Sequence, residues 1–314
     1  MKQDSLIRRY PLITLVLTYM VVGTASSVAA SRDIGAQVVG TALAAIFSLL
    51  LLAMLAPCAV GPLRVKADDR KPVLRLAGAI VVAGLVLCLV PAALTAAGFP
   101  VGGFVSATEP ASAESATSAV FDDPSSTEGS SAVWAALPWA QRVLLVLLLC
   151  ATTGIFEESY FRGMVMSCAY EKSSRPSVEG NPVLSAAVFS ALLFGILHAM
   201  PAVSGSAPDA PAWLLAVQNV MKGVQAGMFG FCMAALFVRT RTVWVSALTH
   251  ALFDLAYLGP GLMAAGQIPA TYATGNYGDI VVIALTIALL AAPCVKSARW
   301  LGREVLPYSS ALRK

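Results

Sequence analysis

The chain has 314 residues, of which 58% are hydrophobic and only 12% are charged, and its formal net charge is +4. Soluble domains carry about twice that charged fraction, so the composition excludes an ordinary soluble domain. The basic residues lie near the ends of apolar runs and form no basic stripe interleaved with aromatic residues, which excludes a basic nucleic-acid-binding face. We therefore expect an all-α, polytopic transmembrane helical bundle in a lipid bilayer, with no nucleic-acid partner.

Long apolar runs set the expected architecture. Each run holds about 20 residues without interruption, as a spanning helix requires, whereas the strands of a membrane barrel alternate apolar and polar residues. We predict about eight spans. In chain order they cover 11–30, 35–60, 74–98, 139–172, 182–200, 212–238, 242–258 and 279–295. The first run resembles a signal peptide with small residues at 27–29, but we favour an uncleaved span because many further spans follow.

The positions of the basic residues predict the orientation of these spans. Lys and Arg cluster in alternate connections, namely the N-terminus, 61–75, 172–175, 239–241 and the C-terminus. Because such clusters mark cytoplasmic loops, both termini are expected in the cytoplasm. The Ala-rich composition favours a bacterial cell membrane. Six cysteines, all in or beside apolar segments and without CxxC spacing, are interpreted as small hydrophobic residues rather than as ligands or disulfides.

Composition divides the chain into four regions. Residues 1–98 form an N-terminal three-span region, and 99–137 form an acidic, low-complexity, extracytoplasmic loop that is expected to be disordered. Residues 138–260 form a helical core that contains the candidate site, and 261–314 form a last span with a basic cytoplasmic tail.

Seven ionisable residues lie well inside the predicted spans. An ionisable group at membrane depth costs several kcal/mol, so each is a candidate functional residue. They are Glu157, Glu158, Arg162, His198, Lys222, His250 and Asp254. Both histidines of the chain are in this set, which makes it far more informative than any one of its members.

Helix geometry allows the set to meet at one level. At a rise of 1.5 Å per residue, Glu157 lies about 22 Å from Lys172 and His198 about 25 Å from Asn181. His250 lies about 13 Å from the preceding basic turn. These distances permit one shared site in the inner or middle part of the membrane.

Spacing within the first helix separates two roles. Residues four apart share a helix face, so Glu158 and Arg162 are expected to pair with each other, which lowers the cost of burying both. Glu157 points about 100° away and is free for another partner. Lys222 stands among Gln218, Asn219 and Gln225, and we favour interhelical hydrogen bonding there, aided by small residues at 223 and 227, over a water-lined cavity wall.

The chemistry of the set favours hydrolysis. A carboxylate with two imidazoles can activate a water molecule, either directly or through a metal ion. Two His and one Glu with an open fourth position form a known catalytic zinc set, so Glu157, His198 and His250 are the expected ligands of zinc. Asp254 lies one turn after His250 and can orient its ring or join as a ligand.

Three short motifs resemble those of the CPBP family (CAAX proteases and bacteriocin-processing enzymes, also called Abi). Glu157–Arg162 resembles its EExxxR motif, Phe194–His198 its FxxxH motif and His250–Asp254 its HxxxN/D motif, within about 140–258. The resemblance implies an intramembrane endopeptidase of the type II CAAX prenyl protease kind. Glu157 would activate water beside His198, with His250 and Asp254 completing the site, while Glu158, Arg162 and Phe194 would support it.

One position departs from the family pattern. Residue 254 is often Asn in the family and is Asp here. An Asn side chain can donate a hydrogen bond to an oxyanion, whereas an ionised Asp cannot, so Asp254 is expected to bind a metal or orient a histidine. The family has been interpreted both as glutamate-dependent and as metal-dependent, which leaves zinc as an expectation.

Two alternatives stay open. Buried carboxylates and histidines also form the proton relays of secondary transporters, although the repeated halves typical of those proteins are not seen here. A non-catalytic immunity or partner protein on the same fold is the second alternative. For the protease, the expected substrate is a peptide, a bacteriocin precursor or a membrane-protein tail.

Overall fold

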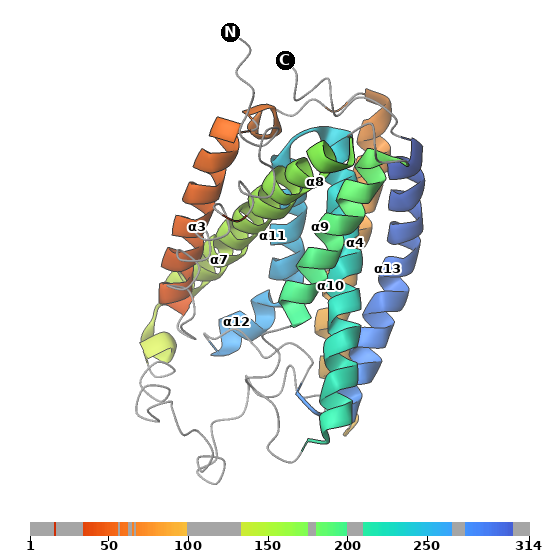
Figure 1. The fold of residues 1–314 in the computed structure, drawn as a ribbon. Coiled ribbons are helices and arrows are strands. Elements are labelled where there is room, and N and C mark those ends of the chain that lie inside the picture. The colour runs from red at the N-terminus through yellow and green to blue at the C-terminus, as the bar shows by residue number, and fades with distance from the viewer. Residues whose placement is uncertain are drawn as a thin grey trace.

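The described part of the chain is an all-helical bundle. The computed structural model describes residues 16, 34–55, 57–61, 65, 67–98, 133–174, 180–199, 210–265 and 274–303. The elements are α3 (Ile34–Leu55), η2 (Pro57–Val60), α4 (Ala67–Ala96), α7 (Trp139–Glu158), η3 (Ser159–Val165), α8 (Met166–Ser173), α9 (Pro182–Ala199), α10 (Ala212–Thr240), α11 (Val243–Tyr257), α12 (Gly259–Ala265) and α13 (Tyr277–Arg303). Figure 1 shows α7 and α8 as one oblique rod beside α3, with α4, α9, α10 and α13 standing opposite.

Six described helices are long and apolar enough to cross a membrane, so the expected count of eight is not confirmed. These six are α3, α4, the continuous 139–173 rod, α9, α10 and α13. The predicted run at 11–30 lies outside the described residues, apart from Val16. The predicted seventh span is α11, which has only 15 residues, fewer than the roughly 20 that a perpendicular span needs.

Large apolar side chains on the outer surface agree with a lipid environment. Met54, Leu74, Leu89, Leu192 and Val220 are each between 60% and 80% exposed. Soluble proteins rarely expose apolar patches of that extent. The bundle thus places apolar surface outward as well as inward, as a membrane-embedded protein does.

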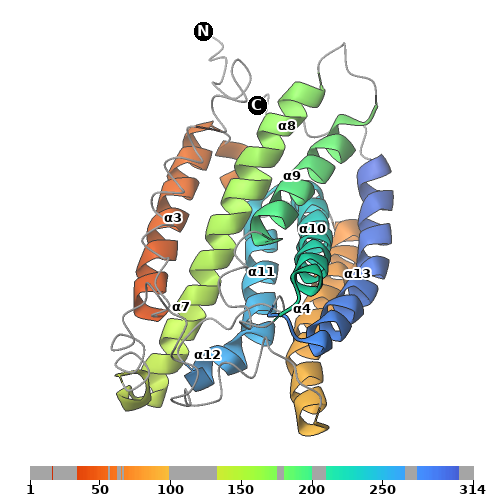
Figure 2. The same ribbon diagram turned by 60° about the horizontal axis from the view of Figure 1, so that its bottom comes forward.

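α10 is the most interior of the candidate spans. In its most apolar window 61% of the residues are buried, against 22–39% in the other five spans. It packs against α9, α13, α4 and α11, and Figure 2 shows α10 with these four helices around it. A fixed central helix of this kind can hold residues of several neighbours at defined positions.

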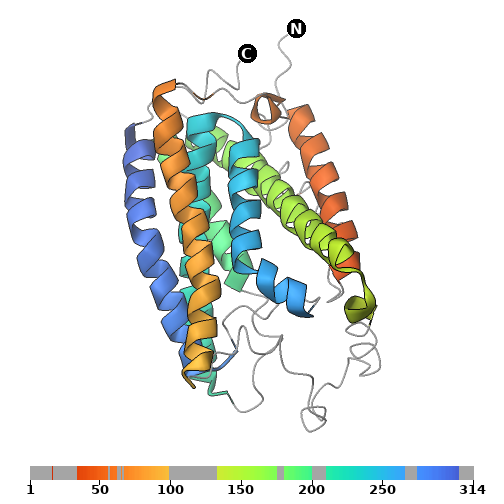
Figure 3. The same cartoon turned by 180° about the vertical axis from the view of Figure 1, so that it is seen from behind.

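α9 and α11 are short, and both end part-way along α10. At 1.5 Å per residue, α9 is about 27 Å long and α11 about 22 Å, whereas α10 extends about 43 Å. Figure 3 shows α11 between α4 and the oblique α7, leading into α12. His198 lies one residue before the end of α9, and Asp254 lies three residues before the end of α11. Both side chains therefore come from helix ends inside the bundle.

Two glycines allow the helices to approach each other closely. A Cβ atom added at Gly154 of α7 would lie 2.6 Å from the carbonyl oxygen of Ala247 on α11. A Cβ atom added at Gly195 of α9 would lie 2.4 Å from the carbonyl oxygen of Gly223 on α10. The small residues at 223 and 227 thus pack against α9, as their spacing indicated.

Some predicted boundaries need correction. The connection expected at 61–75 is helical from Ala67 onward, because α4 begins there and includes Arg70, Lys71 and Arg75. The connection expected at 259–278 contains the short helix α12. Most of the acidic 99–137 region lies outside the described residues.

Candidate active site

A fully buried ion pair forms the base of the site. Arg162 Nε lies 3.1 Å from Glu158 Oε2, and both side chains are 0% exposed. Arg162 also donates through NH2 to the carbonyl oxygen of Gly230 on α10, at 3.0 Å. Its guanidinium carbon lies 4.6 Å from the centre of the Phe194 ring, in cation–π contact. Arg162 therefore connects α7, α9 and α10, and the predicted pairing with Glu158 is present.

A π-helical turn follows the two glutamates, and no sequence pattern predicts it. Residues Ser159–Val165 form this turn between α7 and α8. The Ser190 hydroxyl of α9 donates to the Phe161 carbonyl oxygen at 2.9 Å, which adds a link between this turn and α9. π-helical turns of this kind occur frequently at functional sites, because the wider turn re-aims neighbouring side chains.

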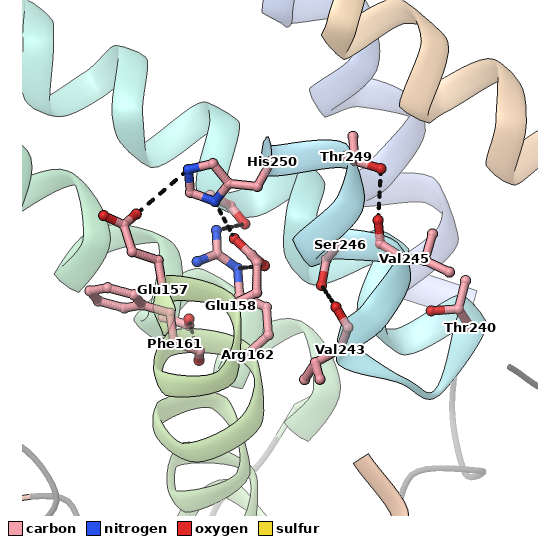
Figure 4. Close-up of polar contacts among 12 residues, drawn as sticks. Glu157, Glu158, Phe161, Arg162, Thr240, Val243, Val245, Ser246, Thr249 and His250 are labelled. Atoms are coloured by element: carbon pink, nitrogen blue, oxygen red, sulfur yellow. Dashed lines mark hydrogen bonds and ion pairs between the residues drawn. The ribbon is translucent and has the colours of Figure 1, made fainter. Parts of the chain in front are cut away.

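His250 lies between the two glutamates, as Figure 4 shows. Its Nδ1 is 2.9 Å from Glu158 Oε1, and its Nε2 is 3.6 Å from Glu157 Oε2. Asp254 Oδ2 also lies 3.6 Å from that Nε2. Glu158 thus contacts His250 as well as Arg162, whereas the sequence assigned it to Arg162 alone.

His198 approaches Glu157 from α9. Its Nε2 is 3.7 Å from Glu157 Oε2, and its Nδ1 is 2.8 Å from the Phe194 carbonyl oxygen. The rings of Phe194 and His198 are stacked, with centroids 4.0 Å apart. Phe229 of α10 meets His250 edge-on at 4.9 Å. Aromatic rings therefore hold both imidazoles in place.

The four candidate catalytic side chains are more accessible than the ion pair beneath them. Among them, His198 is 33% exposed, Glu157 16% and Asp254 13%, while His250 is 5% exposed. Glu158 and Arg162 are fully buried. The set is therefore layered, with an inaccessible support and a partly accessible face.

The hydrogen-bond partners define which nitrogen atoms face Glu157. The Phe194 carbonyl oxygen can only accept, so His198 Nδ1 carries a hydrogen; the Glu158 carboxylate likewise accepts from His250 Nδ1. In the neutral rings, each Nε2 then presents a lone pair toward Glu157 Oε2. That oxygen is buried and has no hydrogen-bond partner among the described residues. Three acceptor atoms therefore converge, an arrangement that favours a shared proton, a water molecule or a cation between them.

Comparison with known proteins agrees with the motifs. The family model described as type II CAAX prenyl endopeptidase Rce1-like matches residues 138–256, less than half of the chain. The chain contains a CAAX-protease-like region. This CAAX-protease-like region includes all seven residues assigned to the site, and its bounds are close to those inferred from the motifs. No curated protein and no solved structure matches the chain.

The donor atoms of the CAAX-protease-like region suit zinc in type. Two imidazole Nε2 atoms and a carboxylate are zinc ligands, and each imidazole is held through Nδ1 by an oxygen atom, as ligand histidines usually are. In the present arrangement, no group of three His, Cys, Asp or Glu side chains in the described ranges is close enough together to hold a metal ion. Glu157, His198 and His250 thus fit a metal ion by their chemistry, but their donor atoms are farther apart than metal ligands are.

Several contacts around the site were not predicted from the sequence. Phe229 and Gly230 belong to no recognised motif, yet one packs on His250 and the other accepts from Arg162. Gln218 bonds the segment before α13, donating to the Asn276 carbonyl oxygen at 2.6 Å and accepting from the Gly275 N–H at 2.9 Å. Gln218 thus bonds to the segment that precedes α13 and not to a neighbouring helix, so the interhelical hydrogen bonding expected for the polar face of α10 stays a prediction.

Proposed function

We propose that the protein is an intramembrane endopeptidase. Its active site, formed by Glu157, His198 and His250, would hydrolyse a peptide bond of a membrane-associated peptide or protein. The main support is the convergence of two imidazole Nε2 atoms on the buried, unpartnered Glu157 Oε2, at 3.6 and 3.7 Å. A carboxylate placed in this way can act as a general base, and its two neighbours can position the water molecule.

In the proposed reaction, a water molecule donates one hydrogen bond to Glu157 and another to an imidazole Nε2. Glu157 takes the proton as the water oxygen adds to the scissile carbonyl carbon, which forms a tetrahedral oxyanion. The C–N bond then breaks, and the proton passes from Glu157 to the leaving amine. Glu158 keeps His250 in the tautomer that leaves Nε2 free, and Arg162 holds Glu158.

Metal assistance is a separate part of the proposal. Zinc held by Glu157, His198 and His250 would polarise the scissile carbonyl and lower the pKa of the attacking water, and in that form of the reaction Glu157 would act as a ligand instead of as the base. Asp254, whose Oδ2 lies 3.6 Å from His250 Nε2, would be a further ligand or a partner of His250.

Comparative analysis of membrane peptides tests the proposal. New peptide termini are compared between cells that contain the wild-type protein and cells that contain Glu157→Gln at equal abundance. We expect at least one cleavage product that depends on wild-type protein and that disappears in Glu157→Gln, His198→Ala and His250→Ala. Identical peptide termini in all four samples would contradict the protease assignment.

The alternative functions predict other results. A proton-coupled transporter would move a solute into liposomes without producing a peptide fragment. A non-catalytic partner protein would retain its biological effect in Glu157→Gln. The absence of an internal repeat in the sequence favours the protease over the transporter.

A further inference from the structure

Lys222 of α10 lies at the same depth as His198, as the contact between α9 and α10 shows. A Cβ atom added at Gly223 would lie 3.5 Å from the Cβ atom of Ala199, and Gly195 meets the Gly223 carbonyl oxygen. Gly223 is therefore level with residues 195–199 of α9. Lys222, its neighbour in the chain, lies level with His198.

The contact between α10 and α11 gives the same depth independently. Phe229 packs against His250 and Phe253, with ring centroids 4.9 and 4.7 Å away. Lys222 precedes Phe229 by seven residues, about 10 Å along α10. Because α11 runs in the opposite direction, this shift leads from His250 to Asp254 and beyond. The side chain of Met221 packs in a cluster with Tyr257, which fits that register.

The Lys222 side chain is buried without a close counter-ion. It is 8% exposed, and no described residue forms a hydrogen bond or an ion pair within 4.0 Å of its ammonium group. Asp254 and His198 are site residues near enough to Lys222 for an electrostatic interaction. A cationic side chain inside a membrane-spanning helix is costly unless it has a function or a partner, so its position at the depth of the site requires an explanation.

The other cationic side chain near the site already has a counter-ion. Arg162 is fully buried, pairs with Glu158 and donates to the Gly230 carbonyl oxygen. The groups that face the reaction are the carboxylates of Glu157 and Asp254 and the imidazoles of His198 and His250. Among the described residues near the site, Lys222 is therefore the cationic side chain that is not already paired with a carboxylate. Position 254 is a carboxylate, which cannot donate a hydrogen bond when it is ionised.

We propose that Lys222 is a catalytic residue whose ammonium group stabilises the oxyanion formed on the scissile carbonyl, with Asp254 acting as its positioning partner. The proposal rests on the proposed endopeptidase function. Lys222 thereby replaces the donor that an Asn at 254 would provide. An oxyanion donor acts mainly in the transition state, because the negative charge develops only there.

The test uses purified full-length protein in phosphatidylethanolamine and phosphatidylglycerol liposomes. The probe is a fluorogenic peptide that spans the cleavage site lost in Glu157→Gln. Lys222→Met, which keeps the length and removes the charge, should lower kcat about a hundredfold to a thousandfold and leave KM within threefold. Lys222→Arg should recover most of the lost rate, and Lys296→Met, which removes a distant lysine, should match the wild type.

Two further measurements separate a catalytic from a structural role. A phosphinic analogue of the probe imitates the tetrahedral anion, so it should bind Lys222→Met at least a hundredfold more weakly than wild type. Adding Asp254→Asn to Lys222→Met should recover part of the rate, because an amide donor is then present. If Lys222→Met does not fold, Lys222→Gln takes its place in both measurements.

Several results would overturn the role of Lys222. These are a kcat within threefold of wild type for the neutral variant, a rise in KM at constant kcat, or equal binding of the phosphinic analogue. If Glu157→Gln is inactive and Lys222→Met is fully active, only the role of Lys222 is wrong. If the Glu157→Gln protein still cleaves the probe, or if no peptide cleavage requires Glu157, the proposed function fails and the role of Lys222 fails with it.

Discussion

The buried Glu158–Arg162 pair allows a quantitative test of what supports the site. Replacing Arg162 by Met leaves the Glu158 carboxylate fully buried without its cation, since both side chains are 0% exposed. Removing one partner of a buried ion pair costs about 3–5 kcal/mol, or roughly a hundredfold to a few thousandfold in the unfolding equilibrium. Glu158→Gln should cost a similar amount, because Arg162 then loses its counter-ion.

The double variant Glu158→Gln/Arg162→Met should be more stable than the sum of the two single effects predicts. Removing both charges also removes the unpaired charge that each single change leaves behind, so we expect a coupling free energy above about 2 kcal/mol. Reversible unfolding in mixed micelles under SDS titration measures all four proteins. Arg239→Met is the matched control, because its 3.1 Å pair with Asp69 is 28% and 17% exposed and should be worth about 1 kcal/mol or less.

Additive effects in this cycle would refute the reasoning. A cost for Arg162→Met no larger than that of Arg239→Met would refute it as well. Either result would mean that water or another cation compensates Glu158, and the layered description of the site would be wrong.

Three other predictions concern the surroundings of the site. Gly154→Leu should separate α7 from α11 and lower cleavage at least a hundredfold, because its side chain would meet the Ala247 carbonyl oxygen at 2.6 Å; Gly78→Leu, with nothing within 4 Å, should have no effect in the same assay. Phe194→Leu should reduce stability by about 1–2 kcal/mol and cleavage about tenfold, because it keeps most of the volume and loses the ring stacked on His198, as unfolding and kinetic measurements would show. Zinc dependence predicts that 1,10-phenanthroline abolishes cleavage and that added zinc restores it; full activity in protein shown to be free of metal by elemental analysis would exclude metal assistance.

Much of the fold could be predicted from the sequence because apolar runs of spanning length are local signals. Five of the eight predicted runs correspond to candidate spans with similar bounds, and the 139–172 run corresponds to the continuous 139–173 rod. The seventh run could not be judged in this way. α11 is apolar enough to resemble a span, but it has only 15 residues. Its packing against α10 and α7 identifies it as a short helix inside the bundle.

The residues of the candidate site were also predictable as a group, whereas of their pairings only the local one was. Helical spacing indicated the Glu158–Arg162 contact, which is local. The Glu158–His250 contact joins residues 92 positions apart and depends on the close approach at Gly154. The π-helical turn had no sequence signal, because neither proline nor a glycine pair marks it. The sequence pattern indicates interhelical hydrogen bonding for Lys222, and only the register of α9 and α11 against α10 places it at the depth of His198 and Asp254.

The central claim is that Glu157 activates the water molecule that hydrolyses the peptide bond. The most direct measurement is the cleavage rate of the membrane-embedded probe peptide by purified protein in liposomes, wild type against Glu157→Gln. We predict a loss of at least a thousandfold in kcat, with unchanged thermal stability and unchanged binding of the peptide. A Glu157→Gln rate within tenfold of wild type would contradict the claim, because an amide cannot accept the proton that the proposed reaction gives to residue 157.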